Sequence, residues 1–359
     1  MTKEFMKENT KLITPEDPAL TYTGRIDFSD RLAPVFVYPA SSIELDFTGT
    51  SCEVILENKN SYWDNYLGFL LDGKQGRIEL DKQEGVKTYR LAEGLEEGKH
   101  SLMLFKRMDS CHIFIFHGFL LDFDSIIIPC ASKSARRIEV YGDSVSAGEV
   151  SEAVEYVGKA DPQHNGEYSN SYYSYAWFTA RRLNARLHDI AQGGISLLDG
   201  TGYFHAPDTM GILSTYDKIE YHPDLSQVKL WDFSLYRPQV VIVAIGQNDK
   251  HPQDYMKEDI ACDKAEFWRL KYKEFILKLR EHYPRALIIL STTILKHDPS
   301  WDTAIDMVCR ELDDPKIKHF LYSNNGEGTD GHIRISEAEQ MSEELASFIE
   351  AFGDEIWRD

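Results

Sequence analysis

Hydrophobic and polar residues alternate along the first third of the chain, over residues 21–123. Apolar side chains recur at every second position in short runs, and glycine-containing turns separate the runs. A period of two is the spacing of a β-strand with one buried face. The runs that predict strands are residues 33–38, 42–47, 52–56, 67–71, 76–80, 101–105 and 112–116. Because no helical period lies between them, this region predicts an antiparallel β-sandwich.

The pattern changes after residue 136, where continuous apolar runs alternate with segments of helical period. The predicted strands are residues 137–141, 187–191, 239–245 and 286–290. The predicted helices are residues 171–184, 264–282, 300–312 and 336–352, the last opening on a capping box of Ser336 and Glu339. Continuous apolar strands that alternate with helices predict a doubly wound α/β domain with a parallel sheet.

The length of 359 residues also favours two domains over one hydrophobic core. We expect a β-sandwich domain over residues 1–128 and an α/β domain over residues 135–359. The linker is expected between them, in a stretch that contains Pro129 and several small polar residues.

Charge narrows the choice of partners. Lys and Arg total 39 against 59 Asp and Glu, so the formal net charge is −20. Such a surface repels phosphate backbones and anionic membranes, which argues against nucleic acid or a membrane as partner and favours neutral substrates. The first residues have no signal-peptide pattern, no apolar run reaches the roughly 20 residues of a membrane span, and the five cysteines lack CxxC spacing. These features predict a cytoplasmic protein with reduced thiols.

Polar and small residues stand where three predicted strands of the α/β domain end. These strand ends are Gly142-Asp143-Ser144, Gln192-Gly193-Gly194 and Gly246-Gln247-Asn248-Asp249. A fourth group, Asp330-Gly331-His332, comes just before the last predicted helix. Because ligands of open parallel sheets bind beyond the carboxyl ends of the strands, these groups predict a site.

The residue types suit acyl transfer through a serine. Ser144 would be the nucleophile, and His332 the base that removes its proton. Asp330 would orient the imidazole of His332. The backbone N–H groups of Ser144 and Gly194, with the side-chain amide of Asn248, would form the oxyanion hole.

Each group taken alone has an ordinary structural explanation. Gly-Asp-Ser is a common turn, and Asn248 could simply satisfy backbone groups at a strand end. Gly194 could permit a tight loop, and His332 could be a surface residue beside a helix. The occurrence of all four in one order, three of them at strand ends, favours the functional interpretation.

These four blocks resemble those of the SGNH (GDSL-type) hydrolases, in which they supply Ser, Gly, Asn and an Asp-x-x-His pair. Here Asp330 and His332 are separated by one residue rather than two. The resemblance therefore leaves two alternatives, in which either Asp330 or a backbone carbonyl orients His332. The second alternative would be a Ser-His dyad.

The N-terminal half extends the resemblance. The residues that carry it are Gly24-Arg25-Ile26-Asp27-Phe28-Ser29-Asp30 with Ala33-Pro34, the stretch 66–73, and His117-Gly118-Phe119. They are similar to the jelly-roll domain of carbohydrate esterase family 2, whose bimodular members join a jelly roll to an SGNH domain and whose last block has the same short form. The resemblance implies removal of O-acetyl groups from plant polysaccharides.

The same resemblance suggests aromatic side chains that stack on sugars. Trp301 looks like the stacking tryptophan of the family, and the alternative is that it packs into the core at the start of a helix. Tyr172 is a second candidate, although an aromatic residue on the predicted helix 171–184 is more often part of the core.

The sequence thus favours a serine acetylesterase that acts on acetylated manno- or xylo-oligosaccharides through an acetyl-enzyme. No cofactor is needed for this reaction, and scattered histidines without ligand spacing do not predict a metal site. Two alternatives remain. One is an SGNH lipase or thioesterase acting on another acyl group, and the other is a carbohydrate-binding protein without turnover.

Overall fold

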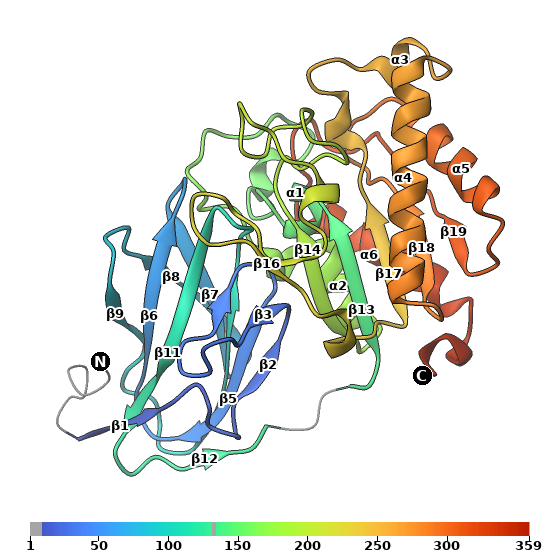
Figure 1. Ribbon diagram of the computed structural model, residues 1–359. Coiled ribbons are helices and arrows are strands. Elements are labelled where there is room, and N and C mark those ends of the chain that lie inside the picture. The colour runs from blue at the N-terminus through green and yellow to red at the C-terminus, as the bar shows by residue number, and fades with distance from the viewer. Residues whose placement is uncertain (1–8, 131–133, 359) are drawn as a thin grey trace. The chain divides into compact units, whose positions relative to one another are not determined.

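The computed structural model describes residues 9–130 and 134–358 (Figure 1). The described residues group into two compact units. The first contains residues 9–130 together with 165–167 and 219–229, and the second contains residues 134–164, 168–218 and 230–358. The predicted fold class, a β-sandwich followed by a doubly wound α/β domain, is confirmed.

The first unit is built from two antiparallel sheets. One sheet has the order β3-β4-β11-β6-β9, with β1 also paired to β11. Its strands are β1 Thr10–Ile13, β3 Ile26–Asp27, β4 Val35–Phe36, β6 Cys52–Asn60, β9 Val86–Ala92 and β11 His112–Asp122. The other has the order β12-β5-β10-β7-β8, with β2 paired to β5. Its strands are β2 Thr21–Thr23, β5 Ser42–Thr48, β7 Asn65–Leu71, β8 Lys74–Leu80, β10 Lys99–Lys106 and β12 Ile127–Ile128.

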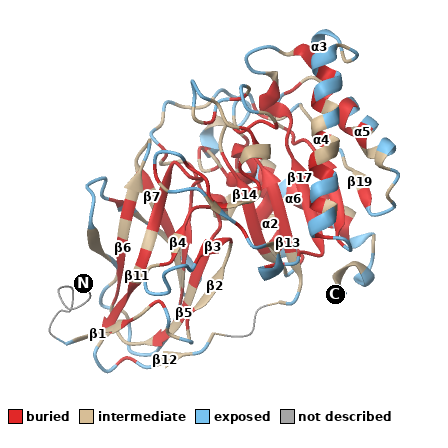
Figure 2. Cartoon of the chain, in the orientation of Figure 1, coloured by how far each residue is buried: buried red, intermediate tan, exposed pale blue. Residues whose placement is uncertain are grey.

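The alternation seen in the sequence is the alternation of burial in this unit. In β5 the side chains of Ile43, Leu45 and Phe47 are fully buried, whereas the intervening residues are partly exposed. Figure 2 shows the buried residues along the strands of both sheets. The core between the sheets therefore forms from residues two apart along each strand.

Two segments from later in the chain belong to the sandwich unit. One of them, residues 219–229, includes most of a ribbon of β15 Lys218–Glu220 and β16 Lys229–Leu230. Lys229 Nζ lies 2.6 Å from Asp27 Oδ2 and 2.7 Å from Glu220 Oε1. This ion-pair cluster attaches the segment to the start of the sandwich, a long-range contact that local periodicity does not reveal.

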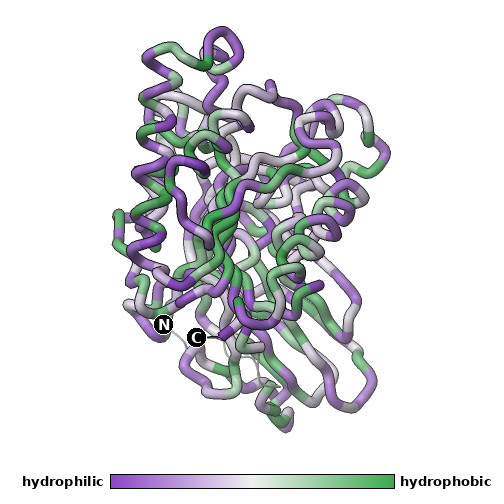
Figure 3. The backbone as a smooth tube through the Cα atoms, turned by 90° about the vertical axis from the view of Figure 1, so that its right-hand side faces the viewer, coloured by the Kyte–Doolittle hydropathy of each residue, from purple (hydrophilic) through white to green (hydrophobic). Residues whose placement is uncertain are grey.

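The second unit has a five-stranded parallel sheet in the order β14-β13-β17-β18-β19. Its strands are β13 Arg137–Gly142, β14 Arg186–Ala191, β17 Val240–Ala244, β18 Leu287–Ser291 and β19 Ile317–His319. All residues of β17 and β18 are buried, as expected for strands covered on both faces. Figure 3 shows hydrophobic strands at the centre of the view, with helices of mixed character outside them.

The strand order fixes where a ligand can bind. The chain runs from β13 to its neighbour β14 on one side, and later continues through β17, β18 and β19 on the other side. The order therefore reverses between β13 and β17. In open parallel sheets the crevice at such a switch point, beyond the carboxyl ends of the strands, is the usual binding site.

Helices cover both faces of this sheet. They are α1 Ser144–Ala147, α2 Tyr175–Arg182, α3 Tyr255–Glu258, α4 Asp263–His282, α5 Ser300–Leu312 and α6 Ile335–Glu350. Helices α2 and α6 pack together on one face, and α4 packs with α5 on the other (Figure 1). Short 3₁₀ helices occur at Val154–Tyr156, Ser171–Tyr173, Ile212–Ser214, Phe233–Leu235, Gln247–Lys250 and Asp354–Trp357.

Two predicted helix starts differ from the structure. The predicted helix 171–184 is broken at Ser174, whose hydroxyl accepts a hydrogen bond from the Trp177 N–H at 3.2 Å and begins α2. The last helix begins at Ile335, and its capping carboxylate is Glu337, which accepts from the Arg334 N–H at 2.9 Å. In the described residues, no helix is both long enough and apolar enough to cross a membrane.

Candidate active site

Ser144 lies at the switch point of the parallel sheet. Strand β13 ends at Gly142, and Asp143 caps the single turn α1 by accepting a hydrogen bond from the Val145 N–H at 3.0 Å. Ser144 is therefore the first helical residue, and it is buried, with 4% of the residue exposed. Its backbone N–H has no acceptor among the described residues, because the first N–H groups of a helix have no partner within the helix.

Gly194 lies in the loop that follows β14, in a left-handed conformation with φ of 71°. A Cβ at this position would lie 2.8 Å from the Cβ of Tyr203, so only glycine fits. The Gly194 carbonyl accepts hydrogen bonds from the N–H groups of Tyr203 and Phe204, at 2.8 and 3.2 Å. The N–H of Gly194 itself has no acceptor among the described residues and remains available to a substrate oxygen.

Asn248 follows β17 and is buried. Its side-chain amide donates to the Ile195 carbonyl at 3.0 Å and to Asp143 Oδ2 at 3.3 Å. The adjacent Asp249 accepts from the Leu197 N–H at 2.9 and 3.0 Å. The residues after β17 therefore contact the other two strand ends. Asn248 joins the Ser144 turn to the Gly194 loop, and Asp249 accepts a hydrogen bond from that loop.

His332 is held by a carboxylate from a distant loop. Its Nδ1 lies 2.7 Å from Oδ2 of Asp161, and its backbone N–H donates to Oδ1 of the same residue at 3.0 Å. Gly331 permits this approach, since a Cβ there would lie 2.6 Å from Asp161 Oδ1. An Nδ1–H that donates to a carboxylate leaves Nε2 as the basic nitrogen.

Asp161 is itself held by Arg334. The fully buried Arg334 guanidinium donates to Asp161 Oδ1 at 2.9 Å and to the His332 carbonyl at 2.6 Å. Burial raises the pKa of Asp161, but the hydrogen bonds from His332 and Arg334 outweigh it and hold the pKa well below its usual range. Asp161 is therefore a carboxylate at every pH at which a histidine base is useful.

Asp330 was expected to orient the imidazole of His332, and this expectation is wrong. Asp330 is exposed, and its carboxylate pairs with Lys296 Nζ at 3.1 Å. Among the described residues, no hydrogen bond or ion pair joins the Asp330 carboxylate to His332. The alternative in which a backbone carbonyl orients His332 is not found either, because the Asp161 carboxylate occupies Nδ1.

Glu149 connects the serine turn to the histidine. Its N–H donates to the Ser144 carbonyl at 2.9 Å, and its Oε2 lies 3.6 Å from Nε2 of His332. No hydrogen bond joins the Ser144 hydroxyl to His332 within the described chain. Such bonds are often absent without substrate and form in the substrate complex.

Three carboxyl groups set the pKa of His332. Burial lowers it, but Glu149, Asp161 and Asp143 together raise the pKa above its ordinary value of 6.5. Burial raises the pKa of Asp143 to about 6, against the hydrogen bond from Val145 and the nearby His332. Acidic groups thus lie on both sides of the His332 imidazole, with Asp161 at Nδ1 and Glu149 near Nε2.

Trp301 is not placed to stack on a sugar. It is fully buried at the start of α5, where its indole N–H donates to Asp254 Oδ1 at 3.0 Å and its ring meets Trp268 edge to face at 5.4 Å. The alternative interpretation, a core residue at a helix start, is the one that the structure supports. The buried residues of α5 recur with the helical period, which explains its direction.

Tyr172 is half-buried in the short 3₁₀ helix before α2. Its ring is covered on one face by the Arg181 guanidinium, 3.9 Å from the ring centroid, and meets Trp177 edge to face. Its face toward Arg181 is therefore unavailable to a sugar.

Tyr203 is an aromatic side chain that the sequence did not single out. It is 52% exposed, its ring stacks on His251 with centroids 4.3 Å apart, and its backbone is bonded to Gly194. This places an exposed ring beside the loop that carries one of the expected oxyanion donors. Exposed rings of this kind offer an apolar face to a ligand.

Comparison with known proteins agrees with this architecture. Residues 22–129 match the family model described as Carbohydrate esterase 2 N-terminal. The solved structure of a family two carbohydrate esterase from Clostridium thermocellum, in complex with cellohexaose, superposes with a TM-score of 0.77 at 29% identity, covering 94% of this chain and 100% of that one. The chain resembles the family two carbohydrate esterases along almost its whole length.

Two curated relatives and a further solved structure support this. The curated protein cellulase/esterase CelE of Acetivibrio thermocellus is 31% identical over 95% of this chain, and the chain spans 40% of the length of CelE. The acetylxylan esterase/glucomannan deacetylase of Cellvibrio japonicus is 23% identical, over 95% of this chain and 91% of that protein. The family two esterase structure from the same organism has a TM-score of 0.80 at 24% identity, covers 97% of this chain and 98% of that one, and supports the fold.

Proposed function

We propose that this chain is a serine acetylesterase that removes O-acetyl groups from acetylated xylo- or manno-oligosaccharides. The observation that carries the proposal is the Asp161–His332 hydrogen bond at 2.7 Å, which leaves Nε2 of His332 directed to the segment that follows Ser144. The names of the relatives, among them acetylxylan esterase and glucomannan deacetylase, support the acetyl group and the sugar.

In the first half of the reaction, the Ser144 hydroxyl attacks the acetyl carbonyl while Nε2 of His332 takes its proton. Asp161 stabilises the imidazolium through Nδ1. The negative oxygen of the tetrahedral intermediate accepts hydrogen bonds from the Ser144 and Gly194 N–H groups, which have no other acceptor among the described residues. The Asn248 amide is the third donor, once it gives up its longer bond to Asp143.

The intermediate then collapses and the bond to the sugar oxygen breaks. His332 returns the proton to that oxygen, so the sugar leaves as an alcohol and an acetyl group remains on Ser144. A water molecule attacks the acetyl-enzyme, again with His332 as base, and acetate leaves with regeneration of the hydroxyl. Tyr203 is the aromatic side chain that we propose to support the sugar, because its exposed ring adjoins the Gly194 loop.

Acetate release from acetylated xylo- and manno-oligosaccharides tests the proposal. Wild type should release acetate, and Ser144→Ala should lose about 10⁴-fold or more in kcat. Ser146→Ala is the matched control, since this serine lies in the same helical turn but its hydroxyl bonds to Tyr175 at 2.9 Å. It should retain acetate release when the two variants are compared at equal folded fraction.

The same assay separates the proposal from its alternatives. A lipase or thioesterase would hydrolyse longer acyl esters faster than acetyl esters. A protein that only binds carbohydrate would release no acetate and would bind the oligosaccharide equally well after Ser144→Ala. Inactivity of the wild type on both oligosaccharides and on p-nitrophenyl acetate would overturn the esterase assignment.

A further inference from the structure

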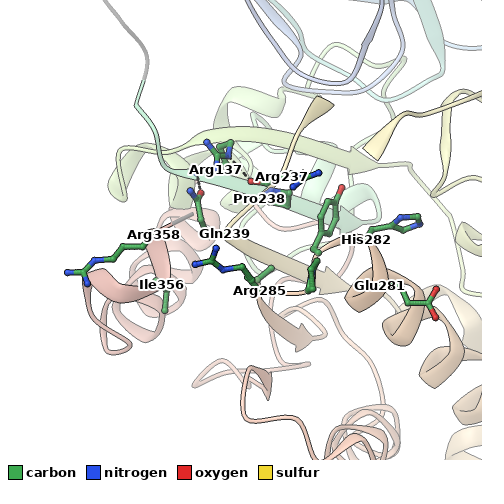
Figure 4. Close-up of a pocket in the computed structure, with 12 residues that line it drawn as sticks. Arg137, Arg237, Pro238, Gln239, Glu281, His282, Arg285, Ile356 and Arg358 are labelled. Carbon is green, nitrogen blue, oxygen red and sulfur yellow. Dashed lines mark hydrogen bonds between the residues drawn. The ribbon is translucent and has the colours of Figure 1, made fainter. Parts of the chain in front are cut away.

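A pocket lies at the opposite end of the parallel sheet from Ser144. Residues just before or at the starts of β13, β17 and β18 line it, together with the last residues of the chain that the structure describes. Its volume is about 550 Å³, within the range of pockets that hold small molecules. Figure 4 shows the side chains that line it.

The charge of this pocket differs from that of the whole chain. Four arginines line it, Arg137, Arg237, Arg285 and Arg358, against the single carboxylate of Glu281. The chain as a whole carries a formal charge of −20. Positive charge is therefore concentrated in this pocket of an otherwise acidic protein. A local concentration of positive charge attracts anionic ligands.

Two of the four guanidinium groups have no hydrogen-bond or ion-pair partner among the described residues. Arg237 and Arg285 are exposed, and no hydrogen bond or ion pair of their side chains is found among residues 9–130 and 134–358. By contrast, Arg358 pairs with Glu355 at 2.7 Å, and Nε of Arg137 donates to the Arg237 carbonyl at 2.6 Å. A guanidinium without a partner keeps all its donors for a ligand.

The walls between these arginines are fixed. The Gln239 side chain accepts from the Arg137 N–H at 2.8 Å and donates to the Trp357 carbonyl at 3.3 Å. It thus attaches the C-terminal segment to the start of β17. In Figure 4, Arg285 extends from the start of β18 toward this segment, where Arg358 lies. The pocket therefore combines walls joined by the hydrogen bonds of Gln239 with two guanidinium groups that have no partner among the described residues.

We infer that this pocket, the arginine pocket, binds a small molecule that carries an oxyanion, as in a sugar phosphate or a uronic acid. Guanidinium groups bind phosphate and carboxylate oxygens through paired N–H donors, which is the chemistry common to both ligands. The pocket is separate from the proposed esterase site, so the inference does not depend on that reaction.

Isothermal titration calorimetry of the whole chain tests the inference with three probes: inorganic phosphate, glucuronate and glucose. We expect phosphate or glucuronate to bind, and glucose, which has no charge, to give no heat. Binding of phosphate alone would indicate phosphate esters as ligands, and binding of glucuronate alone would indicate uronic acids. Because the contacts are exposed ion pairs, raising NaCl from about 0.02 M to about 0.5 M should weaken the binding strongly.

The double variant Arg237→Gln/Arg285→Gln should weaken anion binding at least about tenfold, since it removes both free guanidinium groups. Arg31→Gln is the matched control, because Arg31 is also exposed and also has no side-chain partner among the described residues. It should bind as wild type does. A thermal melt without ligand confirms that both variants are folded.

Three results would overturn the inference. The first is that neither anion binds to the wild type. The second is that the double variant binds as tightly as the wild type, and the third is that Arg31→Gln weakens binding as much as the double variant.

Discussion

The two ends of the parallel sheet differ in how far their charged side chains are held by partners. At the carboxyl ends of the strands, His332 is held by Asp161, and Asp161 is held by the fully buried Arg334. At the amino ends, Arg237 and Arg285 are exposed and have no side-chain partner among the described residues. The first end has groups fixed in one geometry, and the second has groups free to adapt.

The difference in how firmly the side chains are held matches the different chemistry expected at each end of the sheet. Acyl transfer requires donors and a base that are in place before charge develops, because reorganisation during the reaction would raise the barrier. Binding a small anion requires only charge and donors that can close on it. The fixed end is therefore the candidate for catalysis, and the free end is a candidate for binding alone. The following predictions test how far the fixed geometry matters.

The largest effect is expected from Asp161→Asn. The change keeps the size of the side chain but removes the charge that selects the Nδ1–H tautomer of His332, so kcat should fall by about 10⁴-fold. Steady-state hydrolysis of p-nitrophenyl acetate measures it. Asp330→Asn is the control, since this exposed pair with Lys296 contributes little, and its kcat should stay within about twofold of wild type. A large loss in Asp330→Asn with a small one in Asp161→Asn would reverse the assignment.

Asn248→Ala should have the next largest effect. Loss of one oxyanion donor should lower kcat by about 10²- to 10³-fold, with a smaller change in KM. The amide also joins Asp143 to the Ile195 carbonyl, so the melting temperature must be measured with the kinetics. If kcat is retained in a folded variant, the two backbone N–H groups suffice and Asn248 is only structural.

Tyr203→Ala should have a moderate and substrate-dependent effect. Removing the exposed ring should raise KM for acetylated oligosaccharides by about tenfold or less, as expected for one aromatic contact. Hydrolysis of p-nitrophenyl acetate, which has no sugar to stack, should change little. An equal loss on both substrates would mean that the ring supports the Gly194 loop instead.

The smallest effect is a displacement of the pH profile. Since the pKa of His332 is raised, the base is protonated and inactive up to a higher pH than usual, and the acid limb of kcat/KM should lie above 6.5. Glu149→Gln removes a carboxylate that raises this pKa, so the acid limb should move to lower pH. A profile that does not move, or that moves to higher pH, would show that Glu149 does not face the base.

Sequence periodicity was sufficient for most of the fold. The alternation in 42–47 and the continuous apolar run 239–245 correspond to β5 and β17, because burial on one face or on both faces determines each pattern. The attachment of residues 219–229 to the sandwich was not predictable, since it depends on Lys229 meeting Asp27 about 200 positions earlier.

The site residues that directly follow a predicted strand could be predicted from the sequence. Ser144, Gly194 and Asn248 follow strands, so their placement is a consequence of topology. Asp161 carries no such signal, because it lies in a loop without periodicity, 171 residues from His332. Gly331 and Arg334, which lie within two positions of His332, both take part in that contact. For Trp301 the signal existed, since the apolar residues at positions 301, 304, 305 and 308 recur with the helical period, which indicates one buried face.

The acyl-enzyme provides the most direct test of the central claim, that Ser144 is the nucleophile of an esterase. Wild type is mixed with p-nitrophenyl acetate, quenched rapidly in acid and digested, and the acetylated peptide is identified by mass spectrometry. We expect one acetyl group on Ser144, absent from Ser144→Ala and present in Ser146→Ala. Turnover with an acetyl group on another residue, or turnover that persists in Ser144→Ala, would contradict it.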